Sequence, residues 1–226
     1  MQVGSQAAVT VGGILSGTTA ILRANAMWAV LYVLLFSALG SVADTLTQSE
    51  EATLLGGGML LQIAILIGTI VALYRLLETM LRTAGLFIEG TPRRYIAYFG
   101  QGILLSLGVV FGLLLLVVPG LILAARWSIA QPLLVGRGMG ATDALAKSWE
   151  ETREHVGPIL VAGLVLFAGF IVVAIAVIGL LGEEDTIAII AVQLATNAIS
   201  VVSSAMVVAL FGLINPPAER YSDIFG

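Results

Sequence analysis

Residues 117–136 read Val-Val-Pro-Gly-Leu-Ile-Leu-Ala-Ala-Arg-Trp-Ser-Ile-Ala-Gln-Pro-Leu-Leu-Val-Gly, and they decide how the rest of the chain folds. The stretch is largely apolar, and Pro119 with Gly120 forms a strong turn signal. A turn there makes two antiparallel helices, whereas its absence leaves one long kinked helix. We expect the turn at Pro119 and Gly120, and a kink at Pro132 inside the second helix.

The composition of the chain excludes an ordinary water-soluble domain. Of 226 residues, 59% are hydrophobic and 11% charged, and the mean hydropathy is +1.06. Soluble domains are about 45–50% apolar and about 25% charged. The chain has no cysteine and one histidine, so we expect no metal or other cofactor. The net charge of −4 gives no support for a nucleic-acid partner.

Several apolar segments have the length of membrane-spanning helices, which need roughly 20 apolar residues. They cover about residues 26–43, 54–80, 95–118, 121–136, 158–181 and 187–214. Apolar and polar residues rarely alternate along them, which favours helices over a membrane barrel. We predict an all-α, polytopic membrane helix bundle with six transmembrane helices, in one integral membrane domain over residues 1–226.

Two shorter segments predict helices that do not span the membrane. Residues 7–24 place apolar side chains at helical spacing, which is typical of an interfacial helix lying flat before the first span. Residues 141–155 form the second, a cytoplasmic amphipathic helix. Trp149 on its apolar face is predicted to anchor that helix at the headgroup level.

The loop charges predict the topology. With the turn at Pro119 and Gly120, the loops fall into an acidic set without Lys or Arg and a set rich in cations. The acidic set is Asp44, Glu50, Glu51, Glu183, Glu184 and Asp185. The cationic set is Arg75, Arg82, Arg93, Arg94, Arg137, Lys147, Arg153 and Arg220. The positive-inside rule places the cationic set and both termini in the cytoplasm.

Arg126 is the one cation inside an apolar stretch. It follows Pro119 by seven residues, so at a rise of about 1.5 Å per residue it lies roughly 10 Å below the outer surface. A central arginine costs about 2.5–3.5 kcal/mol on insertion scales. Two interpretations remain open. Arg126 binds an anion or lipid headgroup, or it clamps carbonyl groups exposed near Pro132 or at the turn.

Polar residues in other spans suggest a layer at the depth of Arg126. Gln193, Asn197 and Ser200 share one face of the sixth span, and Gln62 lies in the second span at a similar depth. These residues either line a cavity for transport or form interhelical hydrogen bonds worth about 0.6 kcal/mol each.

Four arginines predict a basic rim on the cytoplasmic side: Arg75, Arg82, Arg93 and Arg94. Such a rim attracts anionic lipids by about 1 kcal/mol per cation. The alternative is that these arginines only set the topology.

The segment 117–157 carries a resemblance to a known family. Its pattern consists of Pro119, Gly120, Arg126, Trp127, Pro132, Ala144, Leu145, Ser148 and Trp149. It resembles the membrane domain of some bacterial glycerophosphoryl diester phosphodiesterases and the related YciC-type inner-membrane proteins. The resemblance implies a bacterial inner-membrane location. In those enzymes a separate soluble barrel is catalytic, and the residues after Ile214 are too few for one, so we expect no enzymatic activity.

The leading hypothesis is therefore a non-enzymatic protein that binds or organises membrane lipids, including anionic ones. One alternative is a transporter or channel for ions or small molecules that uses the polar layer. Another is an accessory subunit or homo-oligomer, which the wholly apolar residues 159–181 favour. Gly108 and Gly112 form a GxxxG pattern that fits either dimerisation or packing within the chain.

Overall fold

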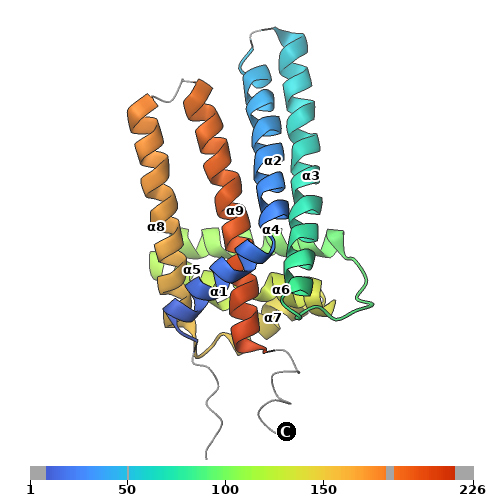
Figure 1. The fold of residues 1–226 in the computed structure, drawn as a ribbon, viewed down its shortest axis with the longest axis vertical. Coiled ribbons are helices and arrows are strands. Elements are labelled where there is room, and N and C mark those ends of the chain that lie inside the picture. The colour runs from blue at the N-terminus through green and yellow to red at the C-terminus, as the bar shows by residue number, and fades with distance from the viewer. Residues whose placement is uncertain (1–8, 50, 182–185, 217–226) are drawn as a thin grey trace, which may run out of the picture. The chain divides into compact units, whose positions relative to one another are not determined.

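The computed structural model describes residues 9–49, 51–181 and 186–216, and within them the chain forms helices and no strands (Figure 1). In chain order the helices are α1 (Val11–Ala24), α2 (Ala26–Thr47), α3 (Ala52–Thr83), α4 (Tyr95–Leu115), α5 (Val117–Arg126), α6 (Ala130–Arg137), α7 (Ala141–Glu151), α8 (Val156–Leu181) and α9 (Thr186–Ile214). The predicted all-α helical bundle is confirmed.

Among the described residues, six segments are long and apolar enough to cross a membrane. They are Ala26–Thr47, Thr53–Thr83, Tyr95–Leu115, Val117–Arg137, Val156–Val177 and Ile187–Ile214. Each corresponds to one predicted span, with ends that differ by a few residues. The protein is accordingly a multi-pass membrane protein.

The chain forms two compact units, and each is described by itself. Unit 1 comprises Met1–Asn25, Leu77–Leu164 and Ser204–Gly226, and unit 2 comprises Ala26–Leu76 and Val165–Ser203. Unit 1 therefore contains α1 and α4 to α7, and unit 2 contains α2. The helices α3, α8 and α9 each contribute one part to each unit.

The α4–α5 hairpin of unit 1 reverses the chain at Leu116. This residue is extended, with φ −160° and ψ 133°, between the end of α4 and the start of α5. Pro119 and Gly120 instead lie in the first turn of α5, where a proline lacks only an N–H that has no partner within the helix. The predicted reversal exists, but its predicted position at Pro119 and Gly120 is wrong by three residues.

Glycines allow α4 and α5 to pack backbone against backbone. A Cβ atom on Gly112 would lie 2.7 Å from the Cα of Gly120, and one on Gly120 would lie 2.5 Å from the nitrogen of Leu113. A Cβ atom on Gly108 would lie 2.3 Å from the ring of Trp127. The GxxxG pattern therefore serves packing within the chain.

The predicted fourth span consists of two helices, α5 and α6. The helix is interrupted over residues 127–129 and resumes at Ala130. Pro132 lies in the first turn of α6, so its missing N–H starts a helix rather than bending one. The predicted kink at Pro132 is therefore replaced by a break just before it.

Both predicted short helices are present. Of residues 7–24, the described part is helical from Val11, while residues 7 and 8 lie outside the described ranges. Gly17 brings α1 against α9, because a Cβ there would lie 3.0 Å from the Cβ of Ala209. The amphipathic helix α7 ends at Glu151, four residues before its predicted end.

Candidate functional site

Arg126 ends α5, and only 9% of its surface is exposed. Its guanidinium lies over the indole ring of Trp149 on α7, with 4.3 Å between the Cζ atom and the ring centroid. A cation over the face of an indole is attracted by the ring quadrupole. Trp149 is 40% exposed. The ring is thus both a partner of the guanidinium and part of the surface.

Two hydroxyl groups hold the main chain of Arg126. Its carbonyl accepts hydrogen bonds from Ser148 Oγ at 2.8 Å and Thr152 Oγ1 at 3.0 Å. The last carbonyls of a helix have no partner within it, so side chains of another element commonly bind them. Both hydroxyl residues are fully buried. The α7 helix therefore caps the C-terminal end of α5 and fixes Arg126 against Trp149.

Two buried polar side-chain atoms near this cap have no hydrogen-bond partner among the described residues, Arg126 Nη1 and Gln101 Oε1. Gln101 on α4 is 0% exposed, and its Nε2 donates to the Ala130 carbonyl at 3.1 Å. A buried donor or acceptor left unpaired costs about 1–3 kcal/mol. The guanidinium thus retains a donor for an acceptor that the described part of the chain does not supply.

The contacts between α7 and Arg126 constrain the level at which Arg126 lies in the membrane. The sequence places Arg126 in the outer half of the membrane, because the count starts at a turn at Pro119, and it places α7 on the cytoplasmic side. The hydrogen bonds from Ser148 and Thr152 exclude that combination, since they tie Arg126 to the level of α7. The outer-half position of Arg126 and the cytoplasmic position of α7 therefore cannot both hold.

The predicted polar layer draws its residues from both units, which are described separately. Arg126 belongs to unit 1, whereas Gln62, Gln193 and Asn197 belong to unit 2. In unit 2, Gln193 Nε2 donates to Asp44 Oδ2 at 2.7 Å, and Gln62 Nε2 lies 3.5 Å from Asp44 Oδ1. The two amides thus join α3 and α9 to a carboxylate on α2.

The rest of the polar stripe is also hydrogen-bonded. Asn197 Nδ2 donates to Ser37 Oγ at 3.2 Å and to the Gln193 carbonyl at 2.9 Å. Ser200 Oγ donates to the Thr196 carbonyl within α9 at 3.0 Å. Only the contact between Asn197 and Ser37 joins two helices, as the alternative to a transport cavity requires, and the other two contacts stay within α9.

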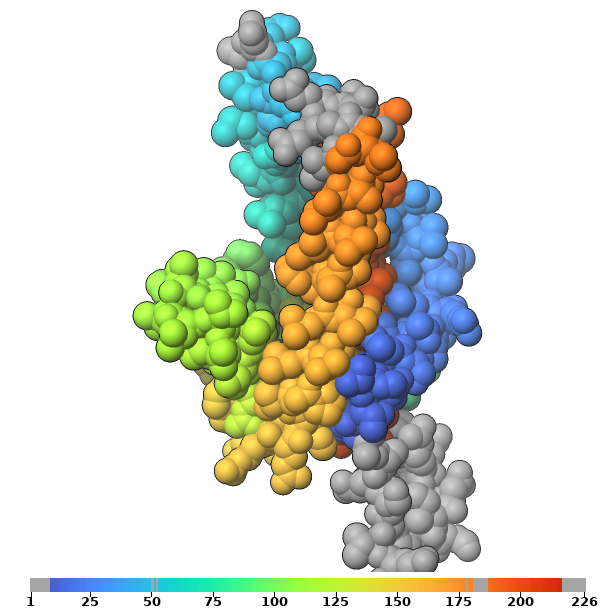
Figure 2. Space-filling view, turned by 90° about the vertical axis from the view of Figure 1, so that its left-hand side faces the viewer, coloured from blue at the N-terminus to red at the C-terminus, as the bar shows by residue number. Residues whose placement is uncertain are grey.

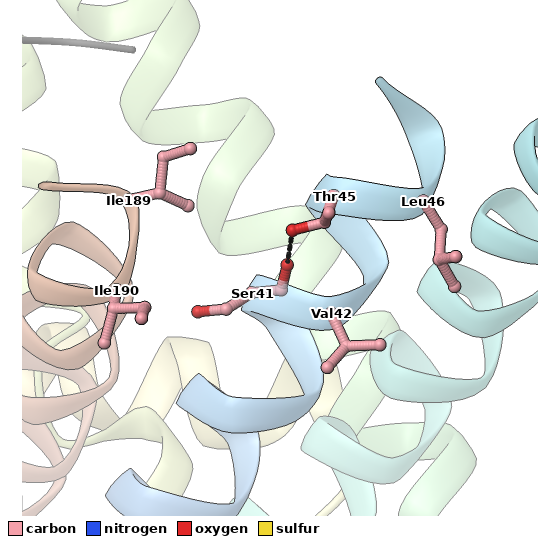
Figure 3. Close-up of a pocket in the computed structure, with 6 residues that line it drawn as sticks. All are labelled: Ser41, Val42, Thr45, Leu46, Ile189 and Ile190. Carbon is pink, nitrogen blue, oxygen red and sulfur yellow. Dashed lines mark hydrogen bonds between the residues drawn. The ribbon is translucent and has the colours of Figure 1, made fainter. Parts of the chain in front are cut away.

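A pocket of about 300 Å³ lies between α2 and α9 in unit 2 (Figure 3). Its lining is Ser41, Val42, Thr45, Leu46, Ile189 and Ile190. The hydroxyls of Ser41 and Thr45 donate to main-chain carbonyls of α2, both at 2.9 Å. The pocket therefore presents mainly apolar surface, and none of the predicted site residues lines it.

The predicted basic rim consists of Arg75, Arg82, Arg93 and Arg94. Arg82 and Arg93 both pair with Glu78, at 3.0 Å and 3.3 Å, and the Glu78 side chain is only 7% exposed. Arg82 also pairs with Glu89. The other two arginines interact with neighbouring groups as well. Much of the positive charge in this rim is thus neutralised within the protein.

A second polar network joins α6, α7 and the end of α9. Arg137 Nη2 donates to Asn215 Oδ1 at 2.7 Å, and Asn215 Nδ2 donates to Glu151 Oε2 at 2.7 Å. Glu151 also lies 3.9 Å from Arg137 and 3.8 Å from Lys147. The sequence did not identify this network, because its members lie on three separate helices.

Within the described residues, no group of three or more His, Cys, Asp or Glu could hold a metal ion. The chain has no significant match to a protein-family model, a curated protein or a solved structure. The resemblance of residues 117–157 to the phosphodiesterase membrane domain therefore stays a hypothesis from the sequence.

Proposed function

We propose that this protein is a non-enzymatic bacterial inner-membrane protein that binds the phosphate of an anionic lipid headgroup at Arg126. The observation that carries the proposal is the buried Nη1 of Arg126, which has no hydrogen-bond partner among the described residues. A phosphate oxygen accepts strong, charge-assisted hydrogen bonds from a guanidinium. The phosphate of a zwitterionic headgroup such as phosphatidylcholine already has the choline cation as its counter-charge, so the phosphate of a net-anionic headgroup should pair more strongly with the arginine.

The surroundings of Arg126 support a lipid rather than a soluble anion. Trp149 lies over the guanidinium, and tryptophan is enriched at the membrane–water interface. Exposed charges on α7, such as Lys147 and Glu150, are also expected at that level. Both features support a guanidinium at the level of the lipid phosphates.

The transporter hypothesis has less support. Gln62, Gln193 and Asn197, the amides proposed to line a pathway, are engaged in hydrogen bonds between helices. The accessory-subunit hypothesis rests on apolar surface alone, and lipid covers such surface equally well. We therefore propose lipid binding, with both termini in the cytoplasm.

The proposal is tested by native mass spectrometry of the purified protein with phosphatidylglycerol or phosphatidylcholine. We expect preferential binding of phosphatidylglycerol, and a loss of about tenfold or more in that preference for Arg126→Gln, because one charge-assisted hydrogen bond is worth about 1.5–3 kcal/mol. Arg153→Gln is the matched control, since it removes the same charge from an exposed position next to α7. Equal losses in both variants, or no preference in the native protein, would contradict the proposal.

A further inference from the structure

The end of the α4–α5 hairpin differs from the other helix connections in its composition. Leu113, Leu114, Leu115, Leu116, Val117 and Val118 follow one another without a polar residue. The exposed fractions of Leu115, Leu116 and Val118 are 80%, 68% and 66%. Figure 2 shows this end of the hairpin, in yellow-green, as part of the surface toward the viewer. A connection that emerged into water would not carry such a run.

The connections between α2 and α3 and between α8 and α9 follow the opposite pattern. Their sequences contain Glu50 and Glu51 in the first case and Glu183, Glu184 and Asp185 in the second. Charged residues favour water over hydrocarbon by several kcal/mol in insertion experiments. The sequences of those two connections are typical of loops in water, whereas the run at the end of the α4–α5 hairpin is typical of a segment in hydrocarbon.

The length of α5 sets how far the hairpin reaches. The helix has 10 residues, so its start lies about 15 Å from Arg126 at about 1.5 Å per residue. Arg126 is bonded through its carbonyl to Ser148 and Thr152 of α7. On α7, the side chain of Glu150 is 71% exposed and that of Lys147 43%, and exposed charges favour a position of this helix at the membrane surface.

These observations give the depth of the hairpin end. The hydrocarbon core is about 30 Å thick, so a segment that reaches at most about 15 Å beyond the surface helix ends no deeper than about the middle of the bilayer. The segments Tyr95–Leu115 and Val117–Arg137 are long and apolar enough to cross the membrane. A hairpin of this depth, however, has the same length and composition as one that crosses fully.

The backbone at Leu116 is suited to such an environment. Non-helical main chain inside hydrocarbon must have its polar groups paired. The Leu116 N–H donates to the Gly112 carbonyl at 3.0 Å, and the Leu116 carbonyl accepts from the Gly120 N–H at 3.4 Å. Pro119 removes one further donor from the first turn of α5. The main chain of the reversal therefore has its polar groups largely paired without hydrogen bonds to water.

We propose that the α4–α5 hairpin is embedded in one leaflet, with residues 113–118 surrounded by acyl chains near the bilayer centre and both hairpin ends on the side of α7. The partner of this surface is the acyl-chain region of the lipid. The inference does not rest on phosphate binding by Arg126, because it uses only the main-chain contact of that residue.

The absence of cysteine from the chain permits a clean test by single-cysteine variants in sealed vesicles of each orientation. Leu115→Cys and Val118→Cys report the hairpin end, Gln48→Cys the α2–α3 connection, and Glu150→Cys the surface of α7. With a membrane-impermeant maleimide, we expect labelling of the Gln48 variant from one side and of the Glu150 variant from the other. The two hairpin variants stay unlabelled until the protein is denatured.

A second measurement gives a positive signal for the hairpin variants, because an absence of labelling alone is negative evidence. A fluorophore attached to the hairpin cysteines in detergent, before reconstitution, should be quenched more by spin labels near the methyl end of the acyl chain than by labels near the headgroup. Labelling of the hairpin variants from the side of Gln48 would show a full crossing, and labelling from the side of Glu150 would show a surface location. Either result, or stronger quenching near the headgroup, would overturn the proposal.

Discussion

The two units are built from similar apolar helices, but they pair their polar groups in different ways. The segments of unit 2 contain a single cation, Arg75, and six acidic residues, Asp44, Glu50, Glu51, Glu183, Glu184 and Asp185. Unit 1 contains the other nine of the ten Lys and Arg residues. In unit 1 arginines pair with carboxylates, whereas in unit 2 neutral amides donate to one carboxylate.

The two units also differ in the groups that they leave available for a ligand. Unit 2 satisfies Gln193 and Asn197 internally and offers a mainly apolar pocket. Unit 1 pairs its cations Arg82 and Arg93, but a donor of Arg126 finds no acceptor in the part of the chain that the structure describes. The unsatisfied group, rather than the larger number of charges, therefore marks the candidate site.

The largest expected effect comes from the charge network of unit 1. Glu78→Gln removes the carboxylate that Arg82 and Arg93 share. Breaking a buried pair costs about 3–5 kcal/mol, and the exposure of both arginines lowers the expected loss of stability to about 2–3 kcal/mol. Unfolding of the purified protein in mixed micelles measures it. Glu89→Gln, at a 76% exposed side chain, should lose far less, and equal losses would contradict the role of Glu78.

The hairpin of unit 1 offers a pair of substitutions with opposite signs. Gly112→Ala forces α4 and α5 apart and should destabilise the protein by about 1–3 kcal/mol, as overpacking does. Gly102→Ala, on the same helix, meets nothing within 4 Å and should stabilise it by up to about 1 kcal/mol through helix propensity. The same unfolding assay measures both, and a destabilising Gly102→Ala would show that the close approach is not the cause.

The amide network of unit 2 should respond more weakly. Asp44→Ala removes the acceptor of Gln193 and Gln62, with an expected loss of about 0.6–2 kcal/mol. A double-mutant cycle with Gln193→Ala isolates the direct contact. Asp44→Asn retains an acceptor oxygen and should lose less. Strict additivity of the two alanine substitutions would mean that the hydrogen bond contributes nothing to stability.

Removing one hydroxyl that binds the Arg126 carbonyl should give the smallest loss of stability. Ser148→Ala removes one of two hydroxyls from the Arg126 carbonyl, at an expected loss of about 0.5–1 kcal/mol, because Thr152 still donates to it. Adding Thr152→Val leaves the carbonyl unpaired and should lose more than the sum of the single variants. Purely additive losses in the unfolding assay would show that the two hydroxyls act separately.

The sequence predicted the helical segments well, because apolar runs of membrane length and their flanking charges are local signals. It misplaced the hairpin reversal, since a Pro-Gly pair is a turn signal, yet a proline in the first turn of a helix costs nothing. The true reversal at Leu116 carries no local signal. The close packing of Gly112 against Gly120 is visible only in three dimensions.

The candidate site was predicted in part. Arg126 follows from its position in an apolar stretch, but its neighbour Trp149 lies 23 residues later and on another helix. Gln101 could have been noticed as a polar side chain within the apolar run of α4. The sequence places Asp44 in a loop, although α2 continues to Thr47, and it therefore does not predict the acceptor of the Gln193 amide.

The most direct test of lipid-phosphate binding is a solid-state NMR measurement of nitrogen–phosphorus dipolar coupling in phosphatidylglycerol bilayers, with 15N-labelled arginine side chains. A guanidinium hydrogen-bonded to phosphate places nitrogen about 4 Å or less from phosphorus. We predict a dephased guanidinium signal that disappears in Arg126→Gln and persists in Arg153→Gln. If the native protein and Arg126→Gln give the same dephased guanidinium signal, or if neither gives one, the account is contradicted.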